Sequence, residues 1–138
     1  MKILFDTNVI LDELLERAPF YRSAAKLFEA VELQHLTGYL AATTVTTIHY
    51  LAVRTIGIQK SHREIANLLL LFAVASVNHT VLTAALHLPF RDYEDAVIHE
   101  AARLADVDGI VTRDGADFVK STLPVYTPEE LLVLLKLQ

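Results

Sequence analysis

Six carboxylates in this chain occupy positions that suit metal-assisted chemistry. Asp6 follows the apolar run ILF, and Asp114 comes shortly after a second apolar run, GIV. The others crowd the start of an expected late helix and the loop beyond GIV: Asp92, Glu94, Asp95 and Asp117. Because the chain has no cysteine and no paired histidines at ligand spacing, oxygen ligands would bind the ion, which favours Mg²⁺ or Mn²⁺. Ions held in this way commonly activate water for in-line displacement at phosphorus.

Each of these carboxylates also has a structural interpretation that needs no ion. Acidic side chains in a first turn complement the helix dipole, and Asp92 followed by Asp95 resembles a capping pair. Asp114 fits a turn in the sequence RDG, and Asp117 fits the N-cap of a short turn. Taken one at a time, the residues therefore do not distinguish a metal site from ordinary caps and turns.

The elements that would position these residues alternate between short strands and longer helices. Period-two and short apolar runs predict strands at residues 2–5, 36–40, 74–77, 109–111 and 124–126. Helical periodicity predicts helices at residues 9–15, 20–33, 46–55, 61–72, 81–88, 93–105 and 129–135. Strands separated by helices indicate an α/β fold, with a parallel sheet covered by helices on both faces.

Asp6 and Asp114 would lie at the same rim of such a sheet. Each follows the carboxyl end of an expected strand, and in parallel sheets the ligand crevice lies beyond these ends. Asp6 could instead cap the following helix, but Thr7 could do so without placing a charge against the core. Carboxylates that meet at one rim repel one another unless protons or cations neutralise them.

The helix expected from residue 93 would begin near this rim. Asp92, Asp95 and His99 fall along one stripe of that helix at 3.6 residues per turn. Glu94 points toward the apolar side, which only a first-turn residue tolerates by reaching past the helix end. Asp95 is therefore the helical carboxylate best placed to face the sheet edge.

Composition limits the class of protein. With 138 residues, 53% of them hydrophobic, the chain is long enough for one domain with a real core, spanning residues 1–138. The start lacks a secretory signal pattern and the apolar runs are too short to span a membrane, so we expect a cytoplasmic protein. The net charge of −5 argues against broad electrostatic binding of nucleic acid, although bound cations reverse the local sign.

Several motifs occur together in a characteristic order. The chain carries FDTNV around Asp6, DYEDA from Asp92, IVTRD ending at Asp114, and DF from Asp117. It closes with PVYTPEELL at residues 124–132. Together these motifs resemble those of PIN-domain proteins and are similar to the VapC-type toxins of bacterial toxin–antitoxin pairs. The match covers nearly the whole chain.

This resemblance implies a three-layer α/β/α sandwich with a central, mainly parallel five-stranded sheet. It also implies a Mg²⁺- or Mn²⁺-dependent ribonuclease that hydrolyses phosphodiester bonds in single-stranded RNA. Asp6, Asp95 and Asp114 would hold the metal, with Asp92 and Asp117 assisting. A small antitoxin that blocks the acidic rim and a homodimer are implied as well, with residues 20–33 and 46–55 as contact surfaces.

One position departs from the family pattern. The family often carries a glutamate in the helix after the second strand, where this chain has His49. Histidine is a weaker ligand for a hard cation, so Asp92 or Glu94 would supply the missing carboxylate, or the site is reduced. The alternative function is therefore a catalytically reduced PIN domain that binds RNA or protein.

Neighbouring polar residues have two roles to fill. Thr7, Asn8 and Thr112 are candidates for hydrogen bonds that orient the ligands. Arg91, Arg113 and Lys120 could bind phosphates flanking the scissile one, or could be solvated surface cations.

A rival phosphotransferase reading would use Asp6 as a nucleophile, as haloacid-dehalogenase-like enzymes do. Those enzymes usually have a second aspartate where this chain has Asn8, and no lysine precedes the TRD segment in the expected way.

Overall fold

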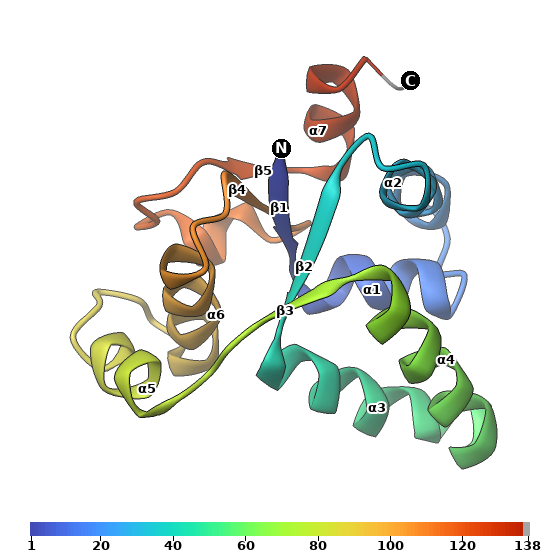
Figure 1. The fold of residues 1–138 in the computed structure, drawn as a ribbon, viewed down its shortest axis with the longest axis horizontal. Coiled ribbons are helices and arrows are strands. Elements are labelled where there is room, and N and C mark those ends of the chain that lie inside the picture. The colour runs from blue at the N-terminus through green and yellow to red at the C-terminus, as the bar shows by residue number, and fades with distance from the viewer. Residues whose placement is uncertain (137–138) are drawn as a thin grey trace.

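A five-stranded, all-parallel sheet runs through the middle of the molecule and is covered by helices on both faces (Figure 1). The computed structural model describes residues 1–136. The strands are β1 (Lys2–Phe5), β2 (Thr37–Ala41), β3 (Ala73–Ala75), β4 (Gly109–Val111) and β5 (Val125–Tyr126), in the spatial order β3-β2-β1-β4-β5. The helices are α1 (Thr7–Leu14), α2 (Tyr21–Glu32), α3 (Ala42–Ile56), α4 (Ile58–Leu71), α5 (His79–Ala85), α6 (Tyr93–Leu104), the short 3₁₀ helix η1 (Gly115–Phe118) and α7 (Pro128–Leu134).

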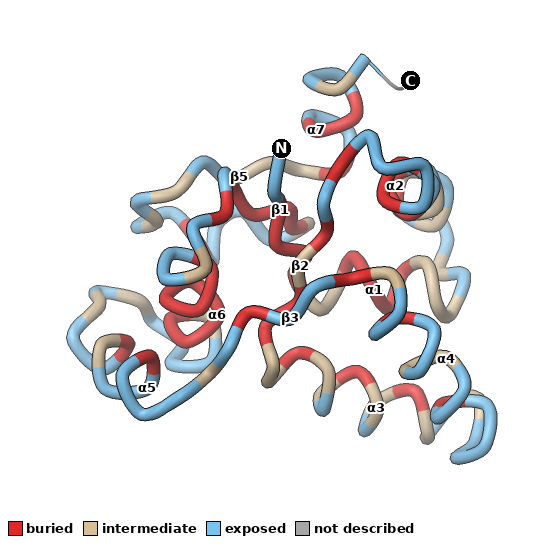
Figure 2. Tube along the Cα trace, in the orientation of Figure 1, coloured by how far each residue is buried: buried red, intermediate tan, exposed pale blue. Residues whose placement is uncertain are grey.

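Alternating side chains of the strands feed two separate cores. In β1, Ile3 and Phe5 pack with α1, α2 and α7 on one face, whereas Leu4 packs with α5 and α6 on the other. In β4, Val111 joins the first core and Ile110 the second. Figure 2 shows buried residues along most of β1, β2, β4 and α6, and exposed residues over most of α4 and α5. The predicted α/β/α sandwich is confirmed.

The strand order reverses direction between β1 and β4. The chain steps from β1 to β2 and β3 on one side, and then returns to place β4 on the other side of β1. Phe5 of β1 pairs with Val111 of β4, so the residues that follow, Asp6 and Thr112, leave the sheet side by side. Such a switch point opens a crevice at the carboxyl ends of the two strands.

Capping residues fix where the helices around this crevice begin. The Asp6 carboxylate accepts a hydrogen bond from the backbone N–H of Thr7 and so caps α1. The Asp92 carboxylate accepts from the backbone N–H groups of Glu94 and Asp95 and so caps α6. Both helices therefore start at the rim because a carboxylate satisfies their free N–H groups.

The expected elements match the observed ones closely. Within residues 1–136 all five strands and all seven expected helices are present, with β1 and β4 at the expected bounds. The strand expected at residues 74–77 is shorter, at 73–75, and the helix expected from residue 46 begins four residues earlier. The 3₁₀ helix η1 was not expected, because residues 115–118 have no helical periodicity.

Gly38 lets a phenylalanine cluster pack against β2. A Cβ atom at Gly38 would come within 2.5 Å of Cε2 and 2.6 Å of Cδ2 of the Phe72 ring. That ring is itself buried against Phe5 and Phe28. Because that ring has no room to move, Gly38→Ala is expected to lower the free energy of unfolding by about 1–3 kcal/mol. Urea denaturation measures the change.

Gly115→Ala is the matched control, because a Cβ atom there has no neighbour within 4 Å. The two substitutions add the same methyl group. Equal unfolding free energies for the two variants would contradict the role assigned to Gly38.

None of the helices among residues 1–136 is both long and apolar enough to cross a membrane.

Candidate active site

An open, mostly polar cavity of about 370 Å³ lies at the switch point. It is lined by residues that follow β1 and β4 and by residues in or next to α1 and α6: Asp6, Thr7, Asn8, Leu11, Arg17, Asp92, Glu94, Asp95, Ile98, Arg113, Asp114 and Asp117. All six carboxylates singled out in the sequence line this one cavity. The convergence expected from strand ends and helix starts is therefore present in the fold.

Asp6 lies at the floor of the cavity and is 7% exposed. Its Oδ1 accepts the N–H of Thr7 at 2.8 Å, and its Oδ2 accepts the hydroxyl of Thr112 at 2.8 Å. Burial raises the pKa of Asp6, with the hydrogen bonds from Thr112 and Thr7 opposing the rise and Asp114 and Asp117 adding to it. The carboxylate is thus held in one orientation but is electrostatically uncompensated.

Asn8 connects Asp6 to Asp114 across the cavity. Its amide Nδ2 donates to Asp114 Oδ2 at 3.0 Å and lies 3.4 Å from Asp6 Oδ2. These two carboxylate oxygens are therefore no further apart than two hydrogen bonds laid end to end. Thr112 adds a second link, because its hydroxyl accepts the N–H of Asp114 at 3.0 Å while it donates to Asp6. Thr7, Asn8 and Thr112 were expected to orient the ligands. Of these three residues, Asn8 and Thr112 join Asp6 to Asp114.

Asp95 projects from the first turn of α6 into the same cavity. Burial, followed by the negative charges of Asp6, Asp92, Asp117 and Glu94, raises the pKa of Asp95 to about 7. Neutral pH therefore leaves this carboxyl group partly protonated. Carboxyl groups that lie close together, partly buried and without a neutralising cation, have pKa values raised by these causes.

The donor set fits a hard divalent cation. Every potential ligand in the cavity is a carboxylate, hydroxyl or amide oxygen, and such oxygens suit Mg²⁺ or Mn²⁺. The cavity's two arginines, Arg17 and Arg113, are both engaged by Asp12 and do not contact the carboxylates that line the cavity. As the side chains stand, no three histidine, aspartate or glutamate groups among residues 1–136 are close enough to surround one ion. Binding would therefore draw the carboxylates together.

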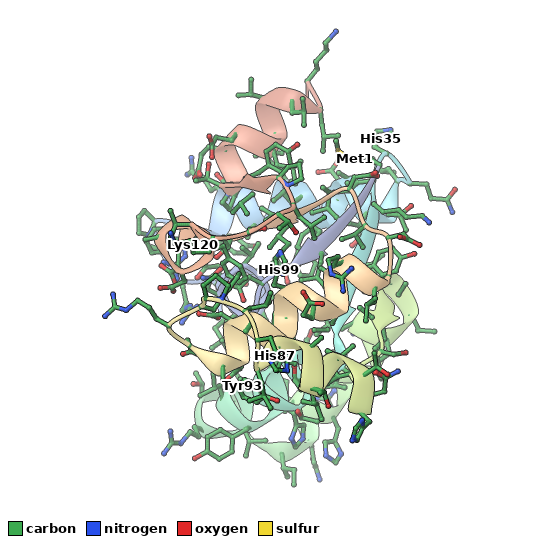
Figure 3. The ribbon with its side chains drawn as sticks, turned by 90° about the vertical axis from the view of Figure 1, so that its left-hand side faces the viewer. Met1, His35, His87, Tyr93, His99 and Lys120 are labelled. Atoms are coloured by element: carbon green, nitrogen blue, oxygen red, sulfur yellow. The ribbon has the colours of Figure 1, made fainter. Side chains whose placement is uncertain are left out.

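Glu94, a candidate for the missing carboxylate, and His49, which stands at the position of the family's glutamate, lie in different places. Glu94 lines the cavity from the first turn of α6, on the exposed side rather than the apolar side. His49 does not line the cavity: its ring packs against His62 of α4, with centroids 4.8 Å apart. The stripe through Asp92 and Asp95 ends inside the protein, because His99 is buried under the segment between η1 and β5 (Figure 3).

His49→Ala is expected to change the Mn²⁺ affinity of the cavity by less than about twofold, because a residue that neither lines the cavity nor orients its ligands lacks the contacts that alter metal affinity. The His49 ring lies between α3 and α4 and does not line the acidic cavity. Isothermal titration calorimetry with Mn²⁺ measures the change. A loss as large as that of a cavity carboxylate variant would place His49 in the site after all.

The three expected phosphate contacts separate into two groups. Arg113 lines the acidic cavity, while Arg91 and Lys120 line a smaller adjoining hollow of about 180 Å³. The two hollows share Asp92, Asp95 and Asp117 as a common wall. Figure 3 shows Lys120 near the outer edge of the molecule, on the segment after η1.

Two residues of the cavity region were not identified from the sequence. Asp12 is 1% exposed and bonds both Arg17 and Arg113. Arg17 lines the cavity and also donates to the backbone carbonyl of Asn8 at 3.3 Å. An aspartate inside the apolar run VILDELL is the signal that could have identified Asp12, since a buried charge needs a partner.

The model of the PIN domain family matches residues 2–116, which is most of the chain. The protein therefore belongs to the PIN-domain family, as its motifs predicted. Comparison with curated proteins found no match.

Several solved structures, among them that of a toxin, share the fold. FitAcB from Neisseria gonorrhoeae is similar at 21% identity with a TM-score of 0.71, over 92% of this chain and 98% of that one. VapBC2 from Rickettsia felis, bound to a DNA fragment from its promoter, is similar at 12% identity and 0.70, over 92% and 98%. The sarcin–ricin loop cleaving toxin VapC20 from Mycobacterium tuberculosis is similar at 13% and 0.68, over 85% and 93%. At these identities the likeness establishes the fold.

Proposed function

We propose that this PIN-domain protein is an endoribonuclease that uses Mg²⁺ or Mn²⁺ to hydrolyse phosphodiester bonds in single-stranded RNA. The observation that carries the proposal is one cavity at the β1–β4 switch point that collects six carboxylates, with Asp6 and Asp95 both raised in pKa. The cavity's own arginines are bound to Asp12 instead. A divalent cation would supply the charge that the site lacks.

Asp6, Asp95 and Asp114 would hold the ion in this proposal, with Asp92, Asp117 and Glu94 close by. When bound, the ion supplies activation of a water molecule and stabilisation of negative charge at the phosphorus. Thr112 and Thr7 fix the Asp6 carboxylate through hydrogen bonds, and Asn8 keeps Asp114 facing Asp6. No side chain of the protein needs to attack the phosphorus, so the reaction leaves no covalent intermediate.

The proposal extends to the cellular role, the partner and the oligomeric state of the chain. We infer that residues 1–138 act in the cytoplasm as the toxin of a toxin–antitoxin pair and form a homodimer. FitAcB, VapBC2 and a Klebsiella pneumoniae toxin–antitoxin complex share the fold and support this inference. A small antitoxin with a basic side chain would suit the acidic cavity. Light scattering would measure the oligomeric state, and the adjacent reading frame would reveal a partner.

A second candidate is a catalytically reduced PIN domain that binds RNA or protein. Two observations favour it: His49 stands where the family often has glutamate, and among residues 1–136 no three potential ligands are already gathered around one point. This candidate predicts binding without hydrolysis. The two functions therefore differ in a single measurable property.

Cleavage of a labelled single-stranded RNA pool tests the proposal, in Mg²⁺, Mn²⁺ or EDTA, with the matching duplex as comparison. We expect cleavage of the single strands with either ion, none in EDTA, and little cleavage of the duplex. RNA binding without cleavage in either ion would support the binding module. Cleavage that persists in EDTA would contradict a metal-dependent reaction.

A further inference from the structure

A buried aspartate holds two arginines at one side of the acidic cavity. Asp12 lies in α1 with its side chain 1% exposed. Its Oδ1 accepts Nε of Arg17 at 3.0 Å and Nη2 of Arg113 at 3.2 Å, and its Oδ2 accepts Nε of Arg113. Arg113 is 101 residues away in the sequence, so this contact joins α1 to the segment after β4. A buried carboxylate with two cationic partners is fully compensated.

Further contacts fix the two guanidinium groups. The Arg113 guanidinium stacks 3.8 Å from the centroid of the Phe20 ring, and its backbone N–H donates to Asn8 Oδ1 at 3.3 Å. Arg17 donates Nη2 to the backbone carbonyl of Asn8 at 3.3 Å. Asn8 also contacts Asp6 and Asp114, so the arginines and the carboxylates share one scaffold. Their relative positions are therefore set by the fold rather than by flexible side chains.

Each arginine keeps capacity for another partner. The side chain of Arg113 is 24% exposed and that of Arg17 is 39% exposed, and both line the cavity. None of the hydrogen bonds described for these side chains within residues 1–136 uses Nη1 of either arginine. Two arginines against one aspartate leave a net charge of +1 on this side of a cavity that is otherwise acidic. Guanidinium groups with free N–H bonds are well suited to phosphate oxygens.

We propose that Arg113 and Arg17 form a phosphate subsite, which binds the RNA backbone one or more nucleotides away from the bond to be cleaved, and that Asp12 is its positioning residue. The inference rests on the proposed ribonuclease function and assigns a different phosphate to each side of the cavity. Asp6, Asp95 and Asp114 would hold the ion that binds the scissile phosphate, and the arginine side binds a neighbouring phosphate. Two fixed points along the backbone hold a flexible strand in register.

Fluorescence anisotropy of a labelled single-stranded RNA tests the subsite, with Ca²⁺ present so that binding is measured apart from cleavage. Arg113→Gln and Arg17→Gln are each expected to raise Kd about tenfold, since each loses a charge-assisted contact to phosphate. Each is also expected to reduce the steepness of log Kd against log salt by about 0.7. Arg63→Gln is the matched control, because Arg63 is an exposed arginine of α4 that does not line the cavity.

Asp12→Asn separates positioning from simple electrostatics. Removing a negative charge beside the subsite would tighten RNA binding if only charge mattered. Loss of positioning instead predicts weaker binding, by about three- to tenfold, although both arginines remain. In cleavage kinetics with Mn²⁺ the loss is expected in KM, with kcat changed by less than about twofold.

A further comparison guards against misfolding of the Asp12→Asn variant. In a chain that carries Arg17→Gln and Arg113→Gln, adding Asp12→Asn is expected to cause no further loss of RNA affinity. An additional loss would show that Asp12 acts through the general structure, and would overturn its positioning role.

The outcomes also separate this inference from the proposed function. Wild-type levels of binding and an unchanged salt slope in both arginine variants would overturn the subsite, while metal-dependent cleavage by the wild type would leave the function intact. A wild-type chain that binds RNA without cleaving it, and loses affinity with Arg113→Gln, would support the subsite and contradict the nuclease. A wild-type chain that neither binds nor cleaves RNA would overturn both.

Discussion

The Asp6→Asn variant is expected to cleave single-stranded RNA at least about 100-fold more slowly than the wild type, because even residues that only orient metal ligands cost up to this much. Its folded state is expected to be as stable as the wild type or more so. Burial raises the pKa of Asp6, so the ionised carboxylate costs the folded state free energy that a neutral amide does not. Asparagine Oδ1 can still accept the hydrogen bond that caps α1.

Cleavage kinetics with Mn²⁺ and urea denaturation of the same preparations measure the two effects. Asp106→Asn is the matched control, because it makes the same chemical change at an exposed position. Asp106 precedes β4 and so lies at the amino ends of the strands, away from the cavity at their carboxyl ends. A variant that retains wild-type cleavage would remove Asp6 from the site. A variant that loses activity only because it unfolds would leave the assignment without support.

In the absence of metal, Asp95 is expected to make the protein less stable as pH rises from about 5 to 8. Its pKa is about 7 in the folded chain against the ordinary value of 3.8, so the folded state binds the proton more tightly than the unfolded state. The favourable contribution is complete below the unfolded value and is lost as pH rises through about 7. Asp6 contributes with the same sign, since its pKa is also raised.

Urea denaturation in EDTA across this pH range measures the effect, as the difference between the wild type and Asp95→Asn. Groups common to both proteins cancel in that difference. We expect the wild type to lose stability relative to the variant as pH rises, and Mn²⁺ to reverse the loss at pH 8 by replacing the proton. A difference that is flat or rises with pH would contradict the environment assigned to Asp95.

The fold and much of the site followed from local patterns. Apolar runs located β1 and β4 at their observed bounds, and Asp6 and Asp114 follow strands whose carboxyl ends must share a rim in a parallel sheet. The sequence left Asp6 open between helix cap and ligand. In the structure Oδ1 caps α1 while Oδ2 accepts the hydroxyl of Thr112 and lies near the Asn8 amide, so the ligand role of Asp6 stays a prediction.

What the sequence could not supply are contacts between distant segments. The bond between Asp12 and Arg113 depends on the order of β1 and β4 in the sheet, which no periodicity specifies. The direction of His49 depends on how α3 packs against α4, and α3 begins four residues earlier than its apolar pattern indicated. Both features arise from tertiary packing, so they appear only once the elements are assembled.

Anomalous X-ray scattering from crystals grown with Mn²⁺ tests the central claim most directly. The account predicts a peak in the cavity with carboxylate oxygens of Asp6, Asp95 and Asp114 at roughly 2 Å. It also predicts that the Asp6→Asn variant lacks this peak under the same conditions. A cavity without Mn²⁺, or an ion bound by other residues such as His49 and His62, would contradict the account.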